Sequence, residues 1–346
     1  MKKVGVLTLY HVRNIGACLQ AYAMRETIKL LGAKPYFIKG YDNSFAFQLF
    51  KGDTGNIRPW NIPFIIRKEL KFRTFFREFP QIAMDEVDRL DSIIIGSDSV
   101  WISKYQQDFM PSCYFGKINN KTVYAYAPSV GGAFDLDDYN KEQLEELNNL
   151  KAITVRDKKT QQFVTNVTGK EASLVADPTL LFDWTILLSQ VKKPRGIPKE
   201  DYILVYGGFN KEMTRKIEEY GSKNGLCVIN VGIYNRQFKN SIAVSPSEFL
   251  HYMNDAKFVV TSMFHGVMIA ISLNKEYRFI SMDPNRNIKL SSTLEKLNLN
   301  NTILSKEQFM NDYIWDGHIN YAMVNGCLSE YRSYSLDKLK RYVNGD

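Results

Sequence analysis

Short apolar runs alternate along the first half of the chain with stretches whose apolar residues recur every three or four positions. The run KVGVLTLY is followed by NIGACLQAYAMRETIKLLG, whose helical spacing ends at Gly32, a residue type common at helix C-termini. Further strand-like runs follow in KPYFIKGYD, DSIIIGSDSVW, KTVYAYAPSVGG, LKAITVRD and KEASLVADPTLLF. Strands that alternate with helices in this way predict βαβ units and a parallel sheet.

The same pattern begins again after residues 191–201, VKKPRGIPKED, whose prolines and charges are typical of a linker. The strand-like runs YILVYGGF, LCVINVG, KFVVTSMFHG and EYRFISMD alternate with helical stretches such as NKEMTRKIEEYGSKNG. Two consecutive Rossmann-like units predict an α/β protein of two lobes, with parallel sheets that face a cleft. We place the first lobe at residues 1–185, the second at 186–325, and an amphipathic helix that packs back on the first lobe at 326–346.

Residues 45–79 interrupt the alternation with a segment that is both aromatic and basic. A helix of this composition can lie on an anionic membrane surface, and it can equally form a helical subdomain whose aromatic side chains belong to the core. We favour the core interpretation and keep peripheral contact with an anionic membrane as the second hypothesis. The residues concerned are Trp60, Phe64, Phe72, Phe75, Phe76 and Phe79, and Arg58, Arg67, Lys68, Lys71, Arg73 and Arg77.

The charge of the chain narrows the class of partner. The 346 residues carry a net charge of +8, which favours anionic partners such as nucleic acids, phosphorylated small molecules or a membrane face. Because the sequence has no RNP motif, zinc-finger spacing or basic low-complexity tail, we expect no nucleic-acid partner. The four cysteines form no CxxC pair, which indicates neither a zinc site nor a disulfide framework. With no apolar run long enough to cross a bilayer, we expect a cytoplasmic protein.

Polar residues follow two strands of the predicted first lobe, at the edge where open α/β sheets bind ligands. Asn14 and Gly16 start a helix whose N-terminus can hold an anion or a polar ligand, although Asn14 can also serve only as the helix cap. Ser97 and Asp98 follow the run DSIIIG, where a carboxylate can act as a base or orient a sugar hydroxyl. Trp101 is either a platform for a sugar ring or a core residue.

Arg156 ends another strand of the first lobe, in AITVRD. A guanidinium there can bind a phosphate or carboxylate through two hydrogen bonds, or it can form a surface ion pair with Asp157. In the nearby VADPTLLF, Asp177 precedes a proline, and we interpret this carboxylate as structural.

His265, one of only four histidines, lies at a strand-to-helix junction in the second lobe. It ends the run KFVVTSMFH and precedes the helix-like GVMIAISLNK, with Ser262 and Gly266 beside it. Position alone leaves open whether the imidazole is a buried structural residue or faces the cleft. If it faces the cleft, it opposes Arg156 and Asp98 of the first lobe.

The chain resembles the polysaccharide pyruvyl transferase family in five motifs that occur in order: KVGVLTLYHVRNIGACLQAYAM, IIIGSDSVW, ITVRDKKT, VADPTLLF and FVVTSMFHGVMIAISLNK. The resemblance runs from residue 3 to about residue 300. It implies a two-lobed fold like that of GT-B glycosyltransferases. It also implies transfer of the three-carbon unit of phosphoenolpyruvate to a sugar, commonly as a cyclic pyruvate ketal, in surface polysaccharide biosynthesis.

The resemblance assigns roles to the candidate residues. The arginine of the family's VRD motif and the histidine of its FHG motif are associated with phosphoenolpyruvate, and they fall on Arg156 and His265. We expect Ser262 and Gly266, which flank this histidine, to bind phosphoenolpyruvate as well. We expect His265 and Asp98 to be catalytic, with Asp98 as the general base. Phosphoenolpyruvate is then a co-substrate, and neither a cofactor nor a metal is expected. The expected acceptor contacts are Asn14, Gly16, Ser97 and Trp101.

The acceptor side departs from the family pattern, because Ser99 and Ile102 stand where the family commonly has Gln and Asn. The resemblance implies a sugar acceptor, in some members a lipid-linked oligosaccharide. Two alternatives remain on the sequence alone. One is a GT-B glycosyltransferase that uses a nucleotide sugar, and the other is a two-lobed protein that binds a sugar or phosphate without catalysis.

Overall fold

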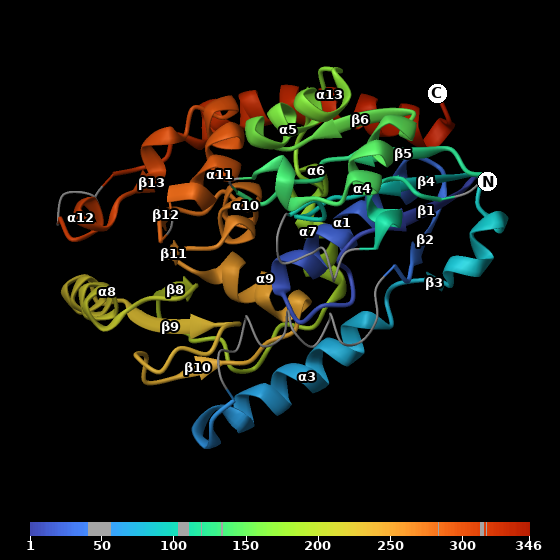
Figure 1. The fold of residues 1–346 in the computed structure, drawn as a ribbon. Coiled ribbons are helices and arrows are strands. Elements are labelled where there is room, and N and C mark those ends of the chain that lie inside the picture. The colour runs from blue at the N-terminus through green and yellow to red at the C-terminus, as the bar shows by residue number, and fades with distance from the viewer. Residues whose placement is uncertain are drawn as a thin grey trace.

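Two parallel β-sheets, each flanked by helices, make up the protein (Figure 1). This arrangement confirms the predicted α/β fold of two Rossmann-like units. None of the described helices is long and apolar enough to cross a membrane. The computed structural model describes residues 1–40, 57–102, 111–118, 120–132, 134–282, 284–311, 315 and 317–346.

The first sheet has the strand order β3-β2-β1-β4-β5-β6-β7. Its central strands read as near-continuous apolar runs, such as SIII in β4, because helices cover both faces of a parallel sheet. Its strands are β1 (Lys3–Leu7), β2 (Lys34–Ile38), β3 (Gln81–Ile82), β4 (Ser92–Ile95), β5 (Val123–Tyr126), β6 (Ala152–Val155) and β7 (Ser173–Leu174). The helices in this part are α1 (Ile15–Leu30), α3 (Ile62–Phe76), α4 (Lys141–Glu146), α5 (Lys158–Thr168) and α6 (Pro178–Leu181).

The second sheet has the order β10-β9-β8-β11-β12-β13. Its strands are β8 (Tyr202–Tyr206), β9 (Cys227–Val231), β10 (Ser241–Ile242), β11 (Phe258–Thr261), β12 (Tyr277–Ile280) and β13 (Ile303–Leu304). Its helices are α7 (Trp184–Gln190), α8 (Lys211–Lys223), α9 (Pro246–Asp255), α10 (Phe264–Ser272), α11 (Pro284–Lys296), α12 (Lys306–Phe309) and α13 (Tyr321–Asn344). Short 3₁₀ turns are η1 (Pro59–Asn61), η2 (Met84–Arg89), η3 (Ser112–Phe115), η4 (Leu136–Asp138), η5 (Leu147–Asn149) and η6 (Asn300–Thr302).

In both sheets all strands are parallel, but the order in which the chain adds them changes direction at a central pair. This pair is β1 and β4 in the first sheet and β8 and β11 in the second. At such a switch point the connections leave in opposite directions, which opens a crevice beyond the carboxyl ends of the strands. The sequence segments singled out above follow these strands directly. The fold therefore places the candidate residues at the edge where α/β proteins bind ligands.

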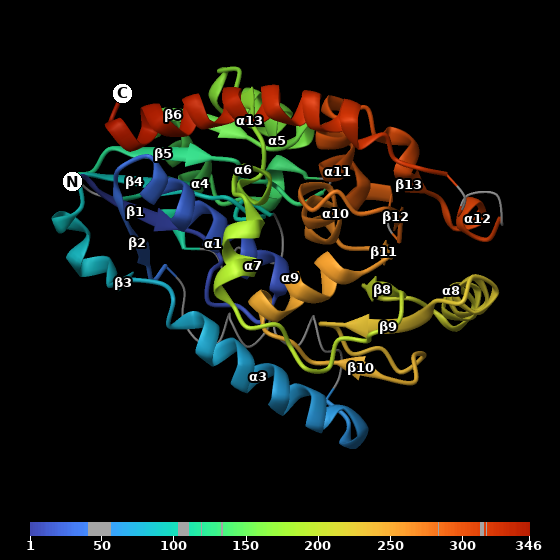
Figure 2. The ribbon, with the colours of Figure 1, turned by 180° about the vertical axis from the view of Figure 1, so that it is seen from behind.

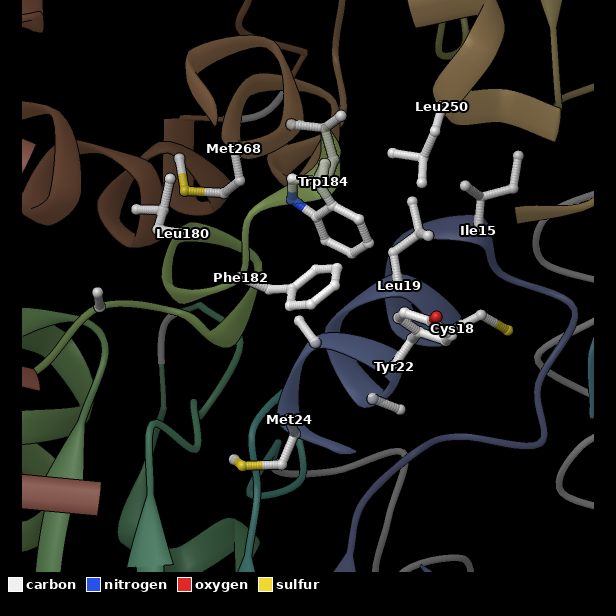
Figure 3. Close-up of a cluster of buried hydrophobic side chains, with 14 of the residues drawn as sticks. Ile15, Cys18, Leu19, Tyr22, Met24, Leu180, Phe182, Trp184, Leu250 and Met268 are labelled. Atoms are coloured by element: carbon white, nitrogen blue, oxygen red, sulfur yellow. The ribbon is translucent and has the colours of Figure 1, made fainter. Parts of the chain in front are cut away.

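One buried apolar cluster joins the two sheets (Figure 3). Tyr22 of α1 lies against Trp184 at the start of α7, with ring centroids 6.3 Å apart, and Phe182 meets Trp184 edge-on at 5.2 Å. Leu250 of α9 and Met268 of α10 belong to the same cluster. Because these side chains come from helices of both sheets, the relative position of the two sheets depends on hydrophobic burial.

The C-terminal helix α13 begins at Tyr321, earlier than the predicted boundary at 326. Figures 1 and 2 show it along one edge of the molecule, with the C-terminus near the N-terminus. The Ser335 hydroxyl accepts a hydrogen bond from the Ala176 amide at 2.8 Å, and Tyr342 stacks on Tyr124 of β5 at 4.7 Å. These contacts hold the helix against elements of the first sheet.

The described part of the aromatic and basic insert, residues 57–79, contains η1 and α3, and residues 45–56 lie outside the described residues. The structure confirms the core interpretation for the phenylalanines of this insert. Phe64, Phe72, Phe75, Phe76 and Phe79 are all buried, whereas Trp60 is 53% exposed.

We predict that Phe72→Ala lowers the free energy of unfolding by about 3–5 kcal/mol, because the ring is fully buried in the shared core. The matched control is Leu70→Ala in the same helix, where the side chain is 60% exposed and the expected change is within about 0.5 kcal/mol. Urea denaturation of both variants measures the difference. Equal effects from the two substitutions would show that α3 is not packed as described.

Candidate active site

A cavity of about 220 Å³ lies between the carboxyl ends of the strands of the two sheets. Its first-sheet side follows β1, β4 and β6, and its second-sheet side follows β8 and β11. Larger hollows of about 390, 410 and 650 Å³ occur elsewhere, but they do not collect the residues that follow these strands. The cavity is lined by Leu9, Val12, Asn14, Ala17, Asp98, Ser99, Ile102, Arg156, Tyr206, Met263, Phe264, His265 and Lys289.

Arg156 is the most deeply buried cation in this cavity, at 2% exposure. Its Nη1 donates to Asp177 Oδ2 at 2.7 Å, and its Nη2 donates to Ser99 Oγ at 3.1 Å and lies 3.4 Å from Asp98 Oδ1. The ring of Phe264, from the second lobe, lies 4.7 Å from the guanidinium carbon. The buried Nε has no hydrogen-bond partner within the described structure, which leaves one strong donor unused.

Asp177 is fully buried and organises the groups around it. Besides the bond from Arg156, it accepts from the amide and hydroxyl of Thr179 at 3.0 and 2.7 Å and so caps α6. Ser97 Oγ lies 3.1 Å away. Burial alone raises the pKa of Asp177, but the charges of His265 and Arg156 and the hydrogen bonds from Thr179 outweigh it and hold the pKa below the usual value. Arg156 therefore pairs with Asp177 and not with its sequence neighbour Asp157.

His265 occupies the first turn of α10, and its side chain is 12% exposed. Its Nε2 lies 3.8 Å from Asp177 Oδ2, beyond hydrogen-bond distance, and has no other partner among the described residues. Burial lowers the pKa of His265 below its ordinary value, and the nearby charges of Asp98 and Asp177 offset this only in part. Burial therefore favours the neutral form of the imidazole.

Two glycines allow the elements around His265 to approach closely. A Cβ at Gly16 of α1 would lie 2.3 Å from His265 Nδ1, so the first-lobe helix contacts the second-lobe imidazole at a point where no side chain fits. A Cβ at Gly266 would lie 2.2 Å from Thr261 Oγ1, so this glycine brings α10 against the end of β11. Neither glycine is part of the cavity lining, and their roles as ligand contacts stay predictions.

Asp98 is held in an unusual backbone conformation, with a φ of 84°. This left-handed region is costly for a non-glycine residue, and such residues are concentrated at functional sites. Its Oδ1 accepts from the Ser99 amide at 2.7 Å, and the side chain remains 12% exposed at the cavity. The strand end thus directs a carboxylate into the space between the lobes.

Lys289 of α11 is a cavity residue that the sequence analysis missed. Its Nζ donates to Ser99 Oγ at 3.0 Å, across the gap from the second lobe to the first. In the sequence, Lys289 is visible only as a lysine in a helix that follows a strand of the second unit. Many surface lysines have the same position, so the sequence does not distinguish Lys289 from them.

The other predicted acceptor contacts lie differently from expectation. Trp101 is fully buried, donates through Nε1 to the Tyr114 carbonyl at 2.7 Å, and belongs to the core and not to a sugar platform. Ser97 is also fully buried and faces Asp177 and the Ala127 carbonyl. Both predictions are corrected by this burial.

Asn14 combines both of the roles considered for it. Its Oδ1 caps α1 by accepting from the Ala17 amide at 3.0 Å, and the residue also lines the cavity. Ser262 is half-buried beside Gly207 at the end of β11, outside the cavity lining.

The cavity brings together groups that can bind an anion, beside the carboxylates of Asp98 and Asp177. Arg156 and Lys289 supply positive charge, and α10 begins at Phe264 without a side-chain cap, so its first amides are available to an acceptor. Asp98 is a potential base, and neutral His265 can take up a proton. Among the described residues, no group of three His, Cys, Asp or Glu side chains could hold a metal ion.

We predict that Asp177→Asn lowers the free energy of unfolding by about 3–5 kcal/mol, because it leaves the Arg156 charge buried without its partner. Asp183→Asn is the matched control: Asp183 caps α7 through Thr185 at 3.0 and 2.7 Å but is exposed. Its expected cost is below about 1 kcal/mol, since Asn caps as well as Asp. Denaturant unfolding compares them, and equal costs would contradict the importance of the buried pair.

Known proteins with a similar fold include enzymes that act on nucleotide sugars or bind nucleotides, according to the names of their structures. The fold is similar to that of the S. aureus MnaA-UDP co-structure (TM-score 0.56, 10% identity, 99% of this chain and 97% of that chain). It is also similar to a putative UDP-N-acetylglucosamine 2-epimerase from Listeria monocytogenes (0.55, 9%, 98% and 95%). A third structure is the Streptomyces sp. SF2575 glycosyltransferase SsfS6 complexed with thymidine diphosphate (0.51, 9%, 100% and 100%).

These identities are low, so the likeness concerns the fold, and it confirms the expected GT-B-like architecture. No curated protein matches the chain significantly in sequence. A sequence model of one family, described as polysaccharide pyruvyl transferase, matches residues 14–284. Because this match covers most of the chain and includes every cavity-lining segment of the first lobe from Asn14 onward, the protein belongs to the polysaccharide pyruvyl transferase family.

Proposed function

We propose that the protein transfers the three-carbon unit of phosphoenolpyruvate to two hydroxyls of a sugar and so forms a cyclic pyruvate ketal. The observation that carries this proposal is the cavity itself. It combines two cations, an uncapped helix N-terminus, a neutral imidazole and a carboxylate in a chain of the pyruvyl transferase family. A small trianion with one phosphate and one carboxylate suits this set of groups.

The donor groups divide between the two lobes. The phosphate is assigned to Lys289 and the first amides of α10, because both come from the second lobe and both can donate hydrogen bonds to an anion. The carboxylate is assigned to Arg156, whose Nε is the unused donor of an otherwise engaged guanidinium. Ser262 stands next to this site and can support the donor from the end of β11.

Proton transfer is assigned to His265 and Asp98. A bound trianion raises the pKa of the neutral imidazole, so donor binding itself creates an acid that can protonate the methylene carbon. A sugar hydroxyl then attacks the resulting electron-poor carbon while Asp98 takes the hydroxyl proton. The carbon–oxygen bond to phosphate breaks, and the leaving phosphate receives the proton from Asp98. The second hydroxyl closes the ring and returns its proton to His265.

The acceptor in this proposal is a sugar of a surface polysaccharide, carried on a lipid and modified in the cytoplasm. Ser99 and Ile102, which replace the Gln and Asn common in the family, both line the cavity. Both are smaller or less polar than the residues they replace, which supports a difference in the acceptor. Ser99 also accepts hydrogen bonds from Arg156 and Lys289, so this position contacts the proposed donor groups as well.

A nucleotide-sugar glycosyltransferase is the second candidate function. It is favoured by the fold, since similar structures include a glycosyltransferase complexed with thymidine diphosphate. The two candidates differ in the donor, so a binding measurement separates them.

We predict that phosphoenolpyruvate raises the melting temperature of the protein, because a ligand at 100 times its Kd stabilises the folded state by about 2.7 kcal/mol. Lys289→Ala is expected to reduce this rise, whereas Lys296→Ala, an exposed residue of the same helix outside the cavity, is expected to preserve it. Differential scanning fluorimetry measures both. A rise with UDP-N-acetylglucosamine and none with phosphoenolpyruvate would favour the glycosyltransferase instead.

A further inference from the structure

The outward side of α3 and the turn before it expose large apolar side chains. Their exposed fractions are 50% for Ile57, 53% for Trp60, 41% for Ile62, 54% for Ile66 and 60% for Leu70. Single exposed apolar residues are ordinary on protein surfaces, but these five all lie within residues 57–70. We call these five residues the α3 apolar face.

Helix geometry explains why this face points outward. At about 100° per residue, Ile62, Ile66 and Leu70 fall within about 80° of one another around α3. Phe64, Lys68 and Phe72 fall on the opposite side, and all three are buried. The helix therefore has two apolar sides, of which one belongs to the core and the other is open.

Arginines surround the α3 apolar face. Arg73 and Arg77 continue the same side of the helix beyond Leu70, and Arg67 borders it; all three are exposed. Arg236 of the second lobe places its guanidinium 4.9 Å from the centre of the exposed Trp60 ring. Arg67, Arg77 and Arg236 have no carboxylate partner in the described part of the chain, so their charges are available to an anionic partner.

Figures 1 and 2 show where this helix lies in the molecule. In both views α3 runs along the lower edge, and its N-terminal end reaches the lowest point, below β10. Helix α3 therefore lies at the periphery of the described part of the molecule.

We propose that the α3 apolar face binds the surface of an anionic lipid bilayer, with the aliphatic side chains and Trp60 among the acyl chains and the arginines at the headgroups. The combination fits a bilayer. Aliphatic side chains favour the acyl chains, tryptophan favours the interface, and the guanidiniums of Arg67 and Arg77 favour anionic headgroups. This surface serves the lipid-linked acceptor of the proposed function, but vesicle binding involves neither donor nor turnover and is tested separately.

The test is sedimentation with vesicles of phosphatidylcholine and phosphatidylglycerol in a ratio of about 7:3, compared with phosphatidylcholine alone. We expect wild-type protein to bind the anionic vesicles and to lose at least about ten-fold in partitioning when Ile62, Ile66 and Leu70 are all replaced by Ser. The matched control replaces three exposed apolar residues elsewhere, Leu30, Ile186 and Met323, by Ser; it is expected to bind like the wild type.

The electrostatic part is tested with Arg67→Gln and Arg77→Gln, each expected to reduce partitioning by about five-fold at low salt. Failure of the wild type to bind anionic vesicles would overturn the proposal, as would equal binding by the Ile62, Ile66 and Leu70 variant. A wild-type dimer that this variant converts to a monomer, without any vesicle binding, would assign the face to a second copy of the chain. The rise in melting temperature with phosphoenolpyruvate reports separately on the proposed function.

Discussion

The buried ion pair between Arg156 and Asp177 connects the candidate site to the rest of the fold. Asp177 caps α6, and the chain after α6 enters the apolar cluster that joins the two sheets, while Arg156 reaches the cavity from the end of β6. Removing two charges from water is costly unless further hydrogen bonds compensate. Here Thr179 provides two and Ser99 one. The pair therefore fixes the guanidinium in place, with its Nε left without a hydrogen-bond partner in the described structure.

This arrangement explains how much of the site could be predicted from the sequence. The strands are near-continuous apolar runs, so their ends were visible, and Arg156, Asp98 and His265 follow those ends and do line one cavity. Trp101 also follows a strand end, yet its ring turns into the core, because the direction of a side chain depends on packing partners that lie far away in the chain. Lys289 was missed for the same reason, since only the folded structure brings α11 to Ser99.

The aromatic and basic insert has one side packed in the core and another side exposed to solvent. The sequence offered a core and a membrane as alternatives for one set of residues. The structure divides the set, with five phenylalanines buried and the exposed side formed by aliphatic residues, Trp60 and arginines. Helical periodicity predicts that α3 has two different sides. Which side faces the core depends on the aromatic residues Tyr10, Tyr22 and Phe37, against which Phe75 and Phe79 pack.

In the function proposed above, the cavity between the lobes binds phosphoenolpyruvate, and His265 becomes protonated when it does. Isothermal titration of phosphoenolpyruvate at about pH 7.5, in two buffers of different ionisation enthalpy, measures the protons taken up on binding. Burial lowers the pKa of His265 below its ordinary value, and an anion bound beside it is expected to raise this pKa. We expect the wild type to take up protons on binding, and His265→Gln to take up clearly fewer. Absence of binding, or the same uptake in both proteins, would contradict this expectation.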